Sequence, residues 1–291
     1  MNASLLENGG KQLRPIVTLL VARSLGGGTC NGDSVKCAVA SELLHNATLL
    51  HDDVADESDE RRSRPTLRRL MGPSASVLVG DFWLVRAVKA ILDIEKDENR
   101  LVTLFAKTLA DLAEGEMLQL QKASSLDTSY EDYMDIICRK TGSLFITCCT
   151  AGAVSVGASD AIRAAAAEYG RCIGCAFQIR DDIFDYMPRT SVGKPVGVDL
   201  VEGKITLPLL GALKNMTPAE DAALRASLRG ITPSRRDEVV ALVREKGGLE
   251  YAQRVLGEFV AKAVDALSAF PDGKDKEYLA RLARYIAIRE K

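Results

Sequence analysis

The stretch that decides the fold is VKCAVASELLHNATLLHDDVAD, residues 35–56. Its apolar residues recur at steps of three and four, which is typical of a helix with one buried face. It ends in Asp52, Asp53 and Asp56, and because a helical turn takes about 3.6 residues, Asp52 and Asp56 lie on the same face. Like charges at this spacing destabilise a helix by about 0.2–0.5 kcal/mol, so helix stability does not account for them. Such a face suits Mg²⁺, which takes one or two carboxylates and fills its other positions with water and phosphate.

Bulk composition is that of an ordinary globular protein. The chain has 291 residues, of which 47% are apolar and 27% are charged. Its net charge of −2 gives no reason to expect a nucleic acid or a membrane surface as a partner. Seven cysteines at irregular spacings do not form a disulfide framework, so we expect buried thiols in a reducing compartment.

The sequence shows no targeting signal and no membrane span. Residues 2–10 lack a cationic start before an apolar core, and the apolar run at 16–22 is too short to cross a bilayer. We therefore expect a cytoplasmic protein with no stable membrane insertion and one domain over residues 1–291.

Helical periodicity continues through most of the chain. The same apolar steps recur in four further segments, residues 74–92, 101–120, 130–156 and 160–186. Glycine and proline interrupt the periodicity, for example at 26–28 and 72–73. Ser129, with Asp132 three residues later, has the form of a capping box that begins a helix. The pattern predicts an all-α fold of ten or more helices and no strand.

A second acidic motif repeats the first. Asp181, Asp182 and Asp185 again have the form Asp-Asp-x-x-Asp at the end of a long apolar helical segment. A single motif is explained well enough by a solvated helix end, but two are hard to explain in that way. If two such helices face each other across a cavity, their charges require divalent cations. Oxygen ligands favour Mg²⁺ or Mn²⁺ over zinc, and Mg²⁺ held in this way normally binds phosphate, which implies a polyphosphate ester as substrate.

Basic residues occur beside glycines or beside the aspartates, where an anionic substrate would need them. They are Lys11 and Arg14 after the glycines at 9–10, Arg61 and Arg62 after the first motif, Lys140 before Thr141, and Lys194 and Lys204 within 193–204. Each alone is an ordinary surface charge, but together they can hold phosphate by charge-assisted hydrogen bonds. The segment 193–204 lacks the Walker pattern and is better suited to a mobile lid. The sequence also lacks a G-x-S-x-G motif and a dinucleotide fingerprint, which argues against those enzyme classes.

Five motifs, in the same order along nearly the whole chain, resemble those of the trans-polyprenyl diphosphate synthases. This family makes farnesyl, geranylgeranyl and longer prenyl diphosphates. The motifs are GGKQLRP at 9–15, LHDDVADESDERR at 50–62, KTG at 140–142, FQIRDDIFD at 177–185 and the lysine pair within 193–204. The resemblance implies an all-α, isoprenoid-synthase-type bundle around a central cavity, usually as a homodimer. Members commonly carry a further helix before the first motif, which we expect to be truncated or absent in this chain.

The resemblance also implies a role for each matching residue. Mg²⁺, or Mn²⁺ in its place, would be held by Asp52, Asp56 and Asp181, with Asp185 as a further candidate ligand. Support for the ions or their waters would come from Asp53, Asp182 and Asp185. The allylic diphosphate would be contacted by Arg61, Lys140, Lys194 and Lys204. Isopentenyl diphosphate would be held by Lys11, Arg14, His45 and Arg62. Thr141 and Gln178 would line the place where the carbocation forms.

The implied reaction is a trans condensation of isopentenyl diphosphate with an allylic prenyl diphosphate. The metal and the basic groups stabilise the departing diphosphate, so that the allylic C–O bond ionises. C4 of isopentenyl diphosphate then attacks the cation, and a proton is lost to the departed diphosphate. Water must be kept out, because it would quench the cation.

Product length is predicted from Ala47 and Thr48, which lie five and four positions before the first aspartate. In this family, bulky aromatic residues at these positions close the pocket below a short product. Both residues are small in this chain, although Ala47 is also explained as a helix-packing alanine. We therefore expect an octaprenyl-type product for quinone side chains, with a geranylgeranyl or farnesyl product as the alternative.

Two other classes share part of this pattern. A class I terpene cyclase has the same fold but needs no site for isopentenyl diphosphate, so Lys11, Arg14 and Arg62 argue against it. A non-catalytic regulatory subunit tends to have damaged aspartate motifs, and both motifs are intact in this chain.

Overall fold

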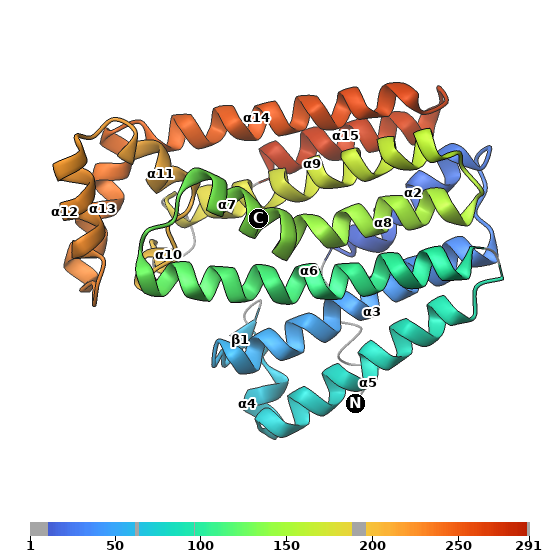
Figure 1. The fold of residues 1–291 in the computed structure, drawn as a ribbon, viewed down its shortest axis with the longest axis horizontal. Coiled ribbons are helices and arrows are strands. Elements are labelled where there is room, and N and C mark those ends of the chain that lie inside the picture. The colour runs from blue at the N-terminus through green and yellow to red at the C-terminus, as the bar shows by residue number, and fades with distance from the viewer. Residues whose placement is uncertain (1–10, 62–63, 96, 188–195, 290–291) are drawn as a thin grey trace. The chain divides into compact units, whose positions relative to one another are not determined.

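The computed structural model describes residues 11–61, 64–95, 97–187 and 196–289, and these residues are almost entirely helical (Figure 1). The expected all-α fold is confirmed. The helices are α2 (Leu13–Leu25), α3 (Gly32–Ala55), α4 (Leu67–Met71), α5 (Pro73–Leu92), α6 (Glu98–Ser125), α7 (Tyr130–Ile137), η1 (Cys138–Gly142), α8 (Ser143–Ser155), α9 (Asp160–Asp185), α10 (Val198–Val201), α11 (Leu207–Leu213), α12 (Pro218–Ser227), α13 (Pro233–Glu245), α14 (Gly248–Ala266), η2 (Leu267–Ala269) and α15 (Lys274–Ile288). Within the described ranges, no helix is both long and apolar enough to cross a bilayer.

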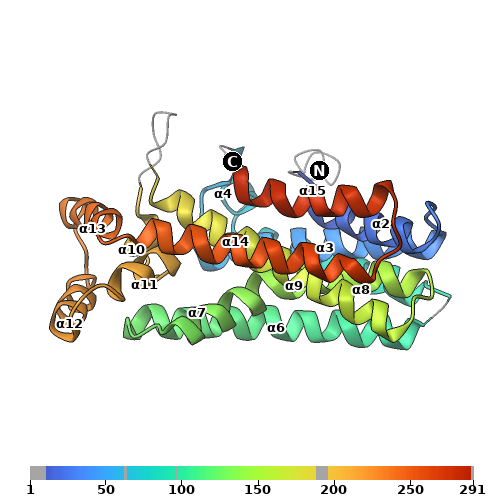
Figure 2. The same cartoon turned by 90° about the horizontal axis from the view of Figure 1, so that it is seen from above.

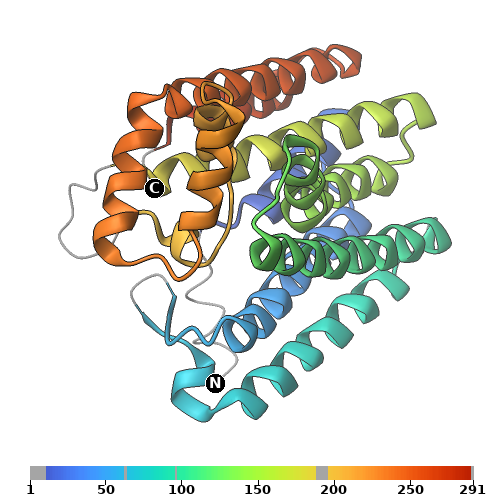
Figure 3. The ribbon, with the colours of Figure 1, turned by 60° about the vertical axis from the view of Figure 1, so that its left-hand side comes forward.

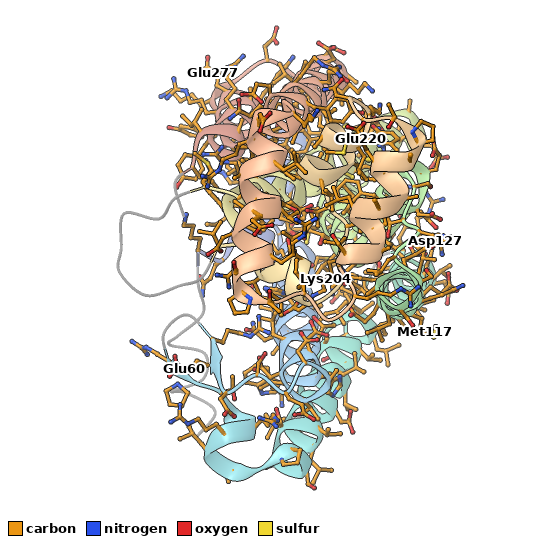
Figure 4. All side chains as sticks on the ribbon, turned by 90° about the vertical axis from the view of Figure 1, so that its left-hand side faces the viewer. Glu60, Met117, Asp127, Lys204, Glu220 and Glu277 are labelled. Carbon is orange, nitrogen blue, oxygen red and sulfur yellow. The ribbon has the colours of Figure 1, made fainter. Side chains whose placement is uncertain are left out.

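A short pair of strands follows the first aspartate motif. β1 (Glu60–Arg61) and β2 (Arg64–Pro65) are antiparallel, with Arg61 opposite Arg64. The side chain of Glu60 points outward from this turn (Figure 4). The prediction of no strand is wrong at this place, because strands this short cannot show the alternation by which a strand is recognised.

The chain forms two compact units. The first comprises residues 1–107, 146–167 and 269–279, and the second comprises residues 108–145, 168–268 and 280–291. The boundaries fall inside five helices, α6, α8, α9, η2 and α15, so these helices contribute residues to both units. The expectation of one domain over residues 1–291 stays a prediction.

In the first unit, α3 packs along α5 and carries the first aspartate motif at its carboxyl end (Figures 1 and 3). Asn31 caps the start of α3, where its side chain accepts a hydrogen bond from the Ser34 amide at 2.8 Å. The two helices approach closely because Gly80 has no side chain: a Cβ at Gly80 would lie 2.4 Å from Nε2 of His51. His51, the residue before the first aspartate, therefore packs directly against the backbone of α5.

In the second unit, α9 carries the second aspartate motif, and α7 leads into the π-helical turn η1. The capping box expected at Ser129 and Asp132 is confirmed, with each side chain accepting a hydrogen bond from the other residue's amide at 3.0 Å. A π-helical turn widens the helix locally and often marks a functional site, and η1 carries Lys140 and Thr141. Also in the second unit, α11 packs against α14 (Figure 2).

The cysteines are free thiols, as expected, and most of them are buried. Cys37, Cys148, Cys149, Cys172 and Cys175 are buried, and Cys138 is half-buried. The expectation of burial is wrong for Cys30, which is exposed because it lies in the connection between α2 and α3.

Candidate active site

The three aspartates of the first motif differ in their surroundings. Asp53 is buried and accepts a hydrogen bond from Nε of Arg61 at 2.8 Å. Asp52 is half-buried, and Asp56, which ends α3, is exposed. The helix therefore places Asp52 and Asp56 at the surface on one face, while Asp53 turns inward and is held by an arginine.

Three of the residues expected to hold isopentenyl diphosphate lie on, or just before, two neighbouring helices of the first unit. α2 packs against α3. Lys11 is exposed just before α2, Arg14 is half-buried in its first turn, and His45 is half-buried in α3. The fourth of these residues, Arg62, lies outside the described residues.

Ala47 and Thr48 occupy different environments within the first unit. Ala47 is 1% exposed and packs in a cluster with Leu50, Leu67 and Trp83. Thr48 is half-buried, and its hydroxyl donates to the carbonyl of His45 at 2.8 Å. Within this unit, Ala47 therefore packs as a small residue at a helix contact. Its effect on product length stays a prediction.

The second unit contains a pocket of about 120 Å³. Five residues singled out from the sequence line it together: Lys140, Thr141, Gln178, Asp182 and Lys204. They come from η1, from α9 and from the segment after α10, in which Lys204 lies (Figure 4). The fold of the second unit thus brings three distant segments of the chain to one site.

A chain of hydrogen bonds runs through this pocket. The Thr141 hydroxyl donates to Oε1 of Gln178 at 2.8 Å, and Nε2 of Gln178 donates to Oδ1 of Asp182 at 2.9 Å. From the other side, the Tyr133 hydroxyl donates to Oδ2 of Asp182 at 2.6 Å. Both carboxylate oxygens of Asp182 are therefore held by neutral donors, which fixes the orientation of the group.

Burial and like charge shape the electrostatics of the pocket. Burial raises the pKa of Asp182 to about 7, although its two hydrogen-bond donors oppose the shift. The pKa of Asp199, which also lines the pocket, is raised well above its usual value by burial and by the charges of Asp182 and Asp185. Carboxylates crowded in this way gain from a bound cation, because a nearby positive charge favours their ionised form.

The two pocket lysines that the motifs singled out, Lys140 and Lys204, already have polar partners. Nζ of Lys140 donates to Oε1 of Gln119 at 2.6 Å and forms an ion pair with Glu116 on α6. Lys204 forms an ion pair with Glu202 at 2.5 Å. Both lysines are half-buried and keep contact with solvent. Ion pairs that water can reach are worth about 0–1 kcal/mol, so an incoming diphosphate can compete for both lysines. The third expected lysine, Lys194, lies outside the described residues.

The other two aspartates of the second motif have specific partners. Asp181 is bound by Arg289, which follows α15, at 2.5 Å. Both oxygens of Asp185 accept backbone hydrogen bonds, from the amides of Val198 and Asp199 at 3.0 Å each, and so cap the first turn of α10. These two bonds fit the supporting role expected for Asp185 better than direct ligation of a metal.

The donor set suits a hard divalent cation that is shared with phosphate. Within the described part of the chain, no three His, Cys, Asp or Glu side chains lie close enough together to hold a metal by themselves. Asp52, Asp56 and Asp181 are nevertheless carboxylates with at least part of their surface exposed. Mg²⁺ typically takes one or two such carboxylates and leaves its other positions to water and phosphate. Within its own unit, each of these carboxylates therefore has the chemistry that a metal–diphosphate complex requires.

Four residues of this site were not found from the sequence. Tyr133 and Glu116 lie in helices that carry no motif at those positions, and Arg289 lies far from every motif. Asp199 did offer a signal, because it is an acidic residue within the same segment, 193–204, that was singled out for its lysines.

Comparison with known proteins shows which family the chain resembles. The sequence model of the polyprenyl synthetase family matches residues 1–245. The octaprenyl diphosphate synthase of Haemophilus influenzae is 41% identical, over 98% of this chain and 85% of that protein. The solved structure of a decaprenyl diphosphate synthase from Rhodobacter capsulatus has a TM-score of 0.91 at 36% identity, over 99% of this chain and 89% of that one. A polyprenyl synthase from Caulobacter crescentus, complexed with calcium and isoprenyl diphosphate, has a TM-score of 0.88 at 37% identity, over 97% and 86%.

The chain therefore belongs to the polyprenyl synthetase family. It is an enzyme of the trans-prenyltransferase class with the all-α isoprenoid-synthase fold, as the five motifs implied. Members of this family use divalent metal, which agrees with the oxygen donors of both aspartate motifs.

Proposed function

We propose that the enzyme condenses isopentenyl diphosphate with an allylic prenyl diphosphate and makes an octaprenyl-type product. One observation carries the proposal: the pocket of the second unit is lined by Lys140 and Lys204 together with the hydrogen-bonded chain of Thr141, Gln178 and Asp182. Relatives named octaprenyl diphosphate synthase, at 41% and 36% identity, support the length of the product.

Asp52, Asp56 and Asp181 are the carboxylates that we assign to the metal, for which we propose Mg²⁺ with Mn²⁺ as a substitute. A bound divalent ion would supply electrostatic stabilisation of the departing diphosphate. Asp53, held by Arg61, would keep the end of α3 in place between the two ligands of that helix. Asp182 would orient the side chains of Gln178 and Tyr133, which donate hydrogen bonds to it.

The basic residues bind the two diphosphates in this proposal. Lys140 and Lys204 would exchange their present ion pairs for the allylic diphosphate, since the terminal oxygens of a diphosphate offer more acceptors than one carboxylate does. Lys11, Arg14 and His45 would hold isopentenyl diphosphate. Arg61, Arg62 and Lys194 would also bind diphosphate, and this assignment rests on the motif match alone.

Thr141 and Gln178 provide the polar lining for the carbocation. The hydroxyl of Thr141 and the amide oxygen of Gln178 lie 2.8 Å apart, so their dipoles are already oriented by one another. Fixed dipoles stabilise developing charge without the reorganisation that water would need. The proton lost in the last step would pass to the diphosphate that Lys140 and Lys204 retain.

We also propose that the enzyme is a homodimer. α5 exposes Leu78, Phe82 and Val85, with 67%, 49% and 65% of their surfaces accessible, at steps that place them on one stripe. α3 adds the exposed Val35 and Val39. Exposed apolar patches of this kind mark interaction surfaces, and a two-fold contact pairs one such stripe with its own copy.

The proposal is tested with the purified protein, farnesyl diphosphate, labelled isopentenyl diphosphate and Mg²⁺, with products separated by chain length. We expect elongation to about eight isoprene units, as the octaprenyl relatives suggest, and no product in excess EDTA. Asp52→Ala should lower kcat at least ~100-fold, because stabilisation of the leaving group is lost. Asp237→Ala, which removes an exposed carboxylate from α13, is the matched control and should retain the wild-type rate.

Two outcomes would contradict the proposal. A cyclic hydrocarbon formed from the allylic diphosphate alone would show that the enzyme is a terpene cyclase. Elongation that occurs only after a second subunit is added would show that this chain is a regulatory or incomplete component.

A further inference from the structure

The last described residue, Arg289, is bound to the second aspartate motif. Its Nη2 donates to Oδ1 of Asp181 at 2.5 Å and to the carbonyl of Phe177 at 3.1 Å. The side chain of Arg289 is 6% exposed, whereas that of Asp181 is 41% exposed. A buried cation from the second unit thus reaches a carboxylate that faces solvent in the same unit.

Several further contacts hold Arg289 in place. Its guanidinium carbon lies 3.9 Å from the ring centroid of Phe177 and 5.5 Å from that of Phe184. Its backbone carbonyl accepts hydrogen bonds from Nε and Nη2 of Arg180, at 3.0 and 2.8 Å. A planar guanidinium stacked in this way has little freedom, so it fixes the carboxylate oxygen that it binds.

Stability alone does not account for this arrangement. A buried guanidinium is costly to remove from water, and apolar residues of similar volume often stabilise a core as well as a buried ion pair does. Nε of Arg289 is also buried without a hydrogen-bond partner among the described residues, which adds to the cost. Packing therefore does not explain why a buried arginine binds this carboxylate. Residues that bind a metal-binding side chain commonly orient it, which would explain the arginine.

We propose that Arg289 is a positioning residue for Asp181 in the metal–diphosphate complex. By binding one carboxylate oxygen, Arg289 fixes the orientation in which Asp181 offers its other oxygen to the ion. The inference rests on the proposed metal role of Asp181 and extends the site to a residue 108 positions further along the chain. Partners that orient a metal-binding side chain typically contribute about 10–100-fold to metal affinity.

Metal binding without turnover tests the inference. Mn²⁺ binding in the presence of inorganic diphosphate is measured by electron paramagnetic resonance for the wild type, Arg289→Gln and Arg289→Lys. We expect Arg289→Gln to bind Mn²⁺ about 10–100-fold more weakly. Arg289→Lys should recover part of the loss, because lysine keeps the charge without the planar fork. In elongation assays, Arg289→Gln should raise the Mg²⁺ concentration for half-maximal rate by a similar factor.

Two further variants test the role of Arg289 separately from the metal role of Asp181. Arg284→Gln removes an exposed arginine of α15 and should bind Mn²⁺ as the wild type does. Asp181→Asn should weaken Mn²⁺ binding, and if it does not, the proposed metal role of Asp181 is wrong. If Asp181→Asn weakens binding and a folded Arg289→Gln does not, Arg289 only anchors α15 to α9.

Two further results also overturn the inference. Tighter Mn²⁺ binding by Arg289→Gln would show that the arginine competes with the ion for Asp181. If circular dichroism shows that the glutamine variant does not fold, Arg289→Lys decides the question, and wild-type affinity in that variant would contradict the proposal.

Discussion

The buried carboxyl of Asp182 connects the chemistry of the second motif with the stability of the fold. Burial raises its pKa to about 7, whereas the carboxyl of an unfolded chain titrates near pH 3.9. Between these values the folded protein binds more protons than the unfolded protein does. The stability that the protonated form contributes is therefore fully present below about pH 4 and is lost as the pH rises to about 7.

Asp182→Asn should remove this loss, because the amide cannot ionise. In EDTA, we expect the free energy of unfolding of the wild type to fall between pH 5 and pH 8, and that of the variant to fall by about 1–3 kcal/mol less. Urea unfolding at both pH values measures the difference, with the exposed Asp237→Asn as the control. Equal losses in all three proteins would show that Asp182 is already ionised in the folded state at pH 5.

Cys138 is a second residue whose titration can be observed directly. A hydrogen bond from the Cys175 thiol lowers the pKa of Cys138 to about 7, although burial opposes the shift. Burial instead raises the pKa of Cys37 to about 12. We expect iodoacetamide to alkylate Cys138 with a rate that levels off above pH 7, whereas alkylation of Cys37 should still be increasing at pH 9, as read by mass spectrometry. Cys175→Ala should move the Cys138 midpoint toward pH 9, and an unchanged profile would contradict this assignment.

At the scale of secondary-structure elements, α3 combines the first aspartate motif with the residues expected to set product length. The helix buries Ala47 against Trp83 of α5, while the neighbouring Thr48 is only half-buried. A larger side chain should therefore disturb the packing more at position 47 than at position 48. Comparing the two positions separates an effect on product length from an effect on protein stability.

Thr48→Phe and Ala47→Phe should both shorten the product, as their position before the first aspartate implies. Ala47→Phe should in addition cost about 1–3 kcal/mol of stability, because it overpacks the cluster around Trp83. Product chromatography and urea unfolding measure the two effects, and Leu70→Phe, at an exposed site of α4, is the control. Wild-type product length in both variants would place the floor of the pocket on another element.

At the scale of the whole molecule, the apolar stripe on α5 predicts self-association. Phe82→Glu places a charge in the middle of this stripe and should convert the proposed dimer to a monomer, since burying an unpaired carboxylate is costly. Light scattering after gel filtration measures the mass. Tyr278→Glu, at an exposed aromatic residue of α15, should leave the dimer intact. A wild-type protein that is monomeric at assay concentration would refute the dimer.

Sequence patterns alone determined that this protein is all-α and where its long helices between residues 35 and 186 lie, and they singled out candidate residues for its chemistry. Those conclusions rest on local properties: the apolar period of residues 35–56, the capping box at Ser129, and the charge spacing of the aspartate motifs. The order of the five motifs was also sufficient for the family. The pair β1–β2 and the π-helical turn η1 escaped this reasoning, because neither has a period that a few residues can show.

Only the tertiary structure decided what surrounds the residues of the site. The bonds from Tyr133 to Asp182 and from Arg289 to Asp181 join residues that are far apart along the chain, as do the amides that bind Asp185. No local pattern encodes such contacts. The physical reason is that the orientation of a carboxylate, its donors and its pKa depend on the groups packed around it, and that packing is set by the whole folded unit.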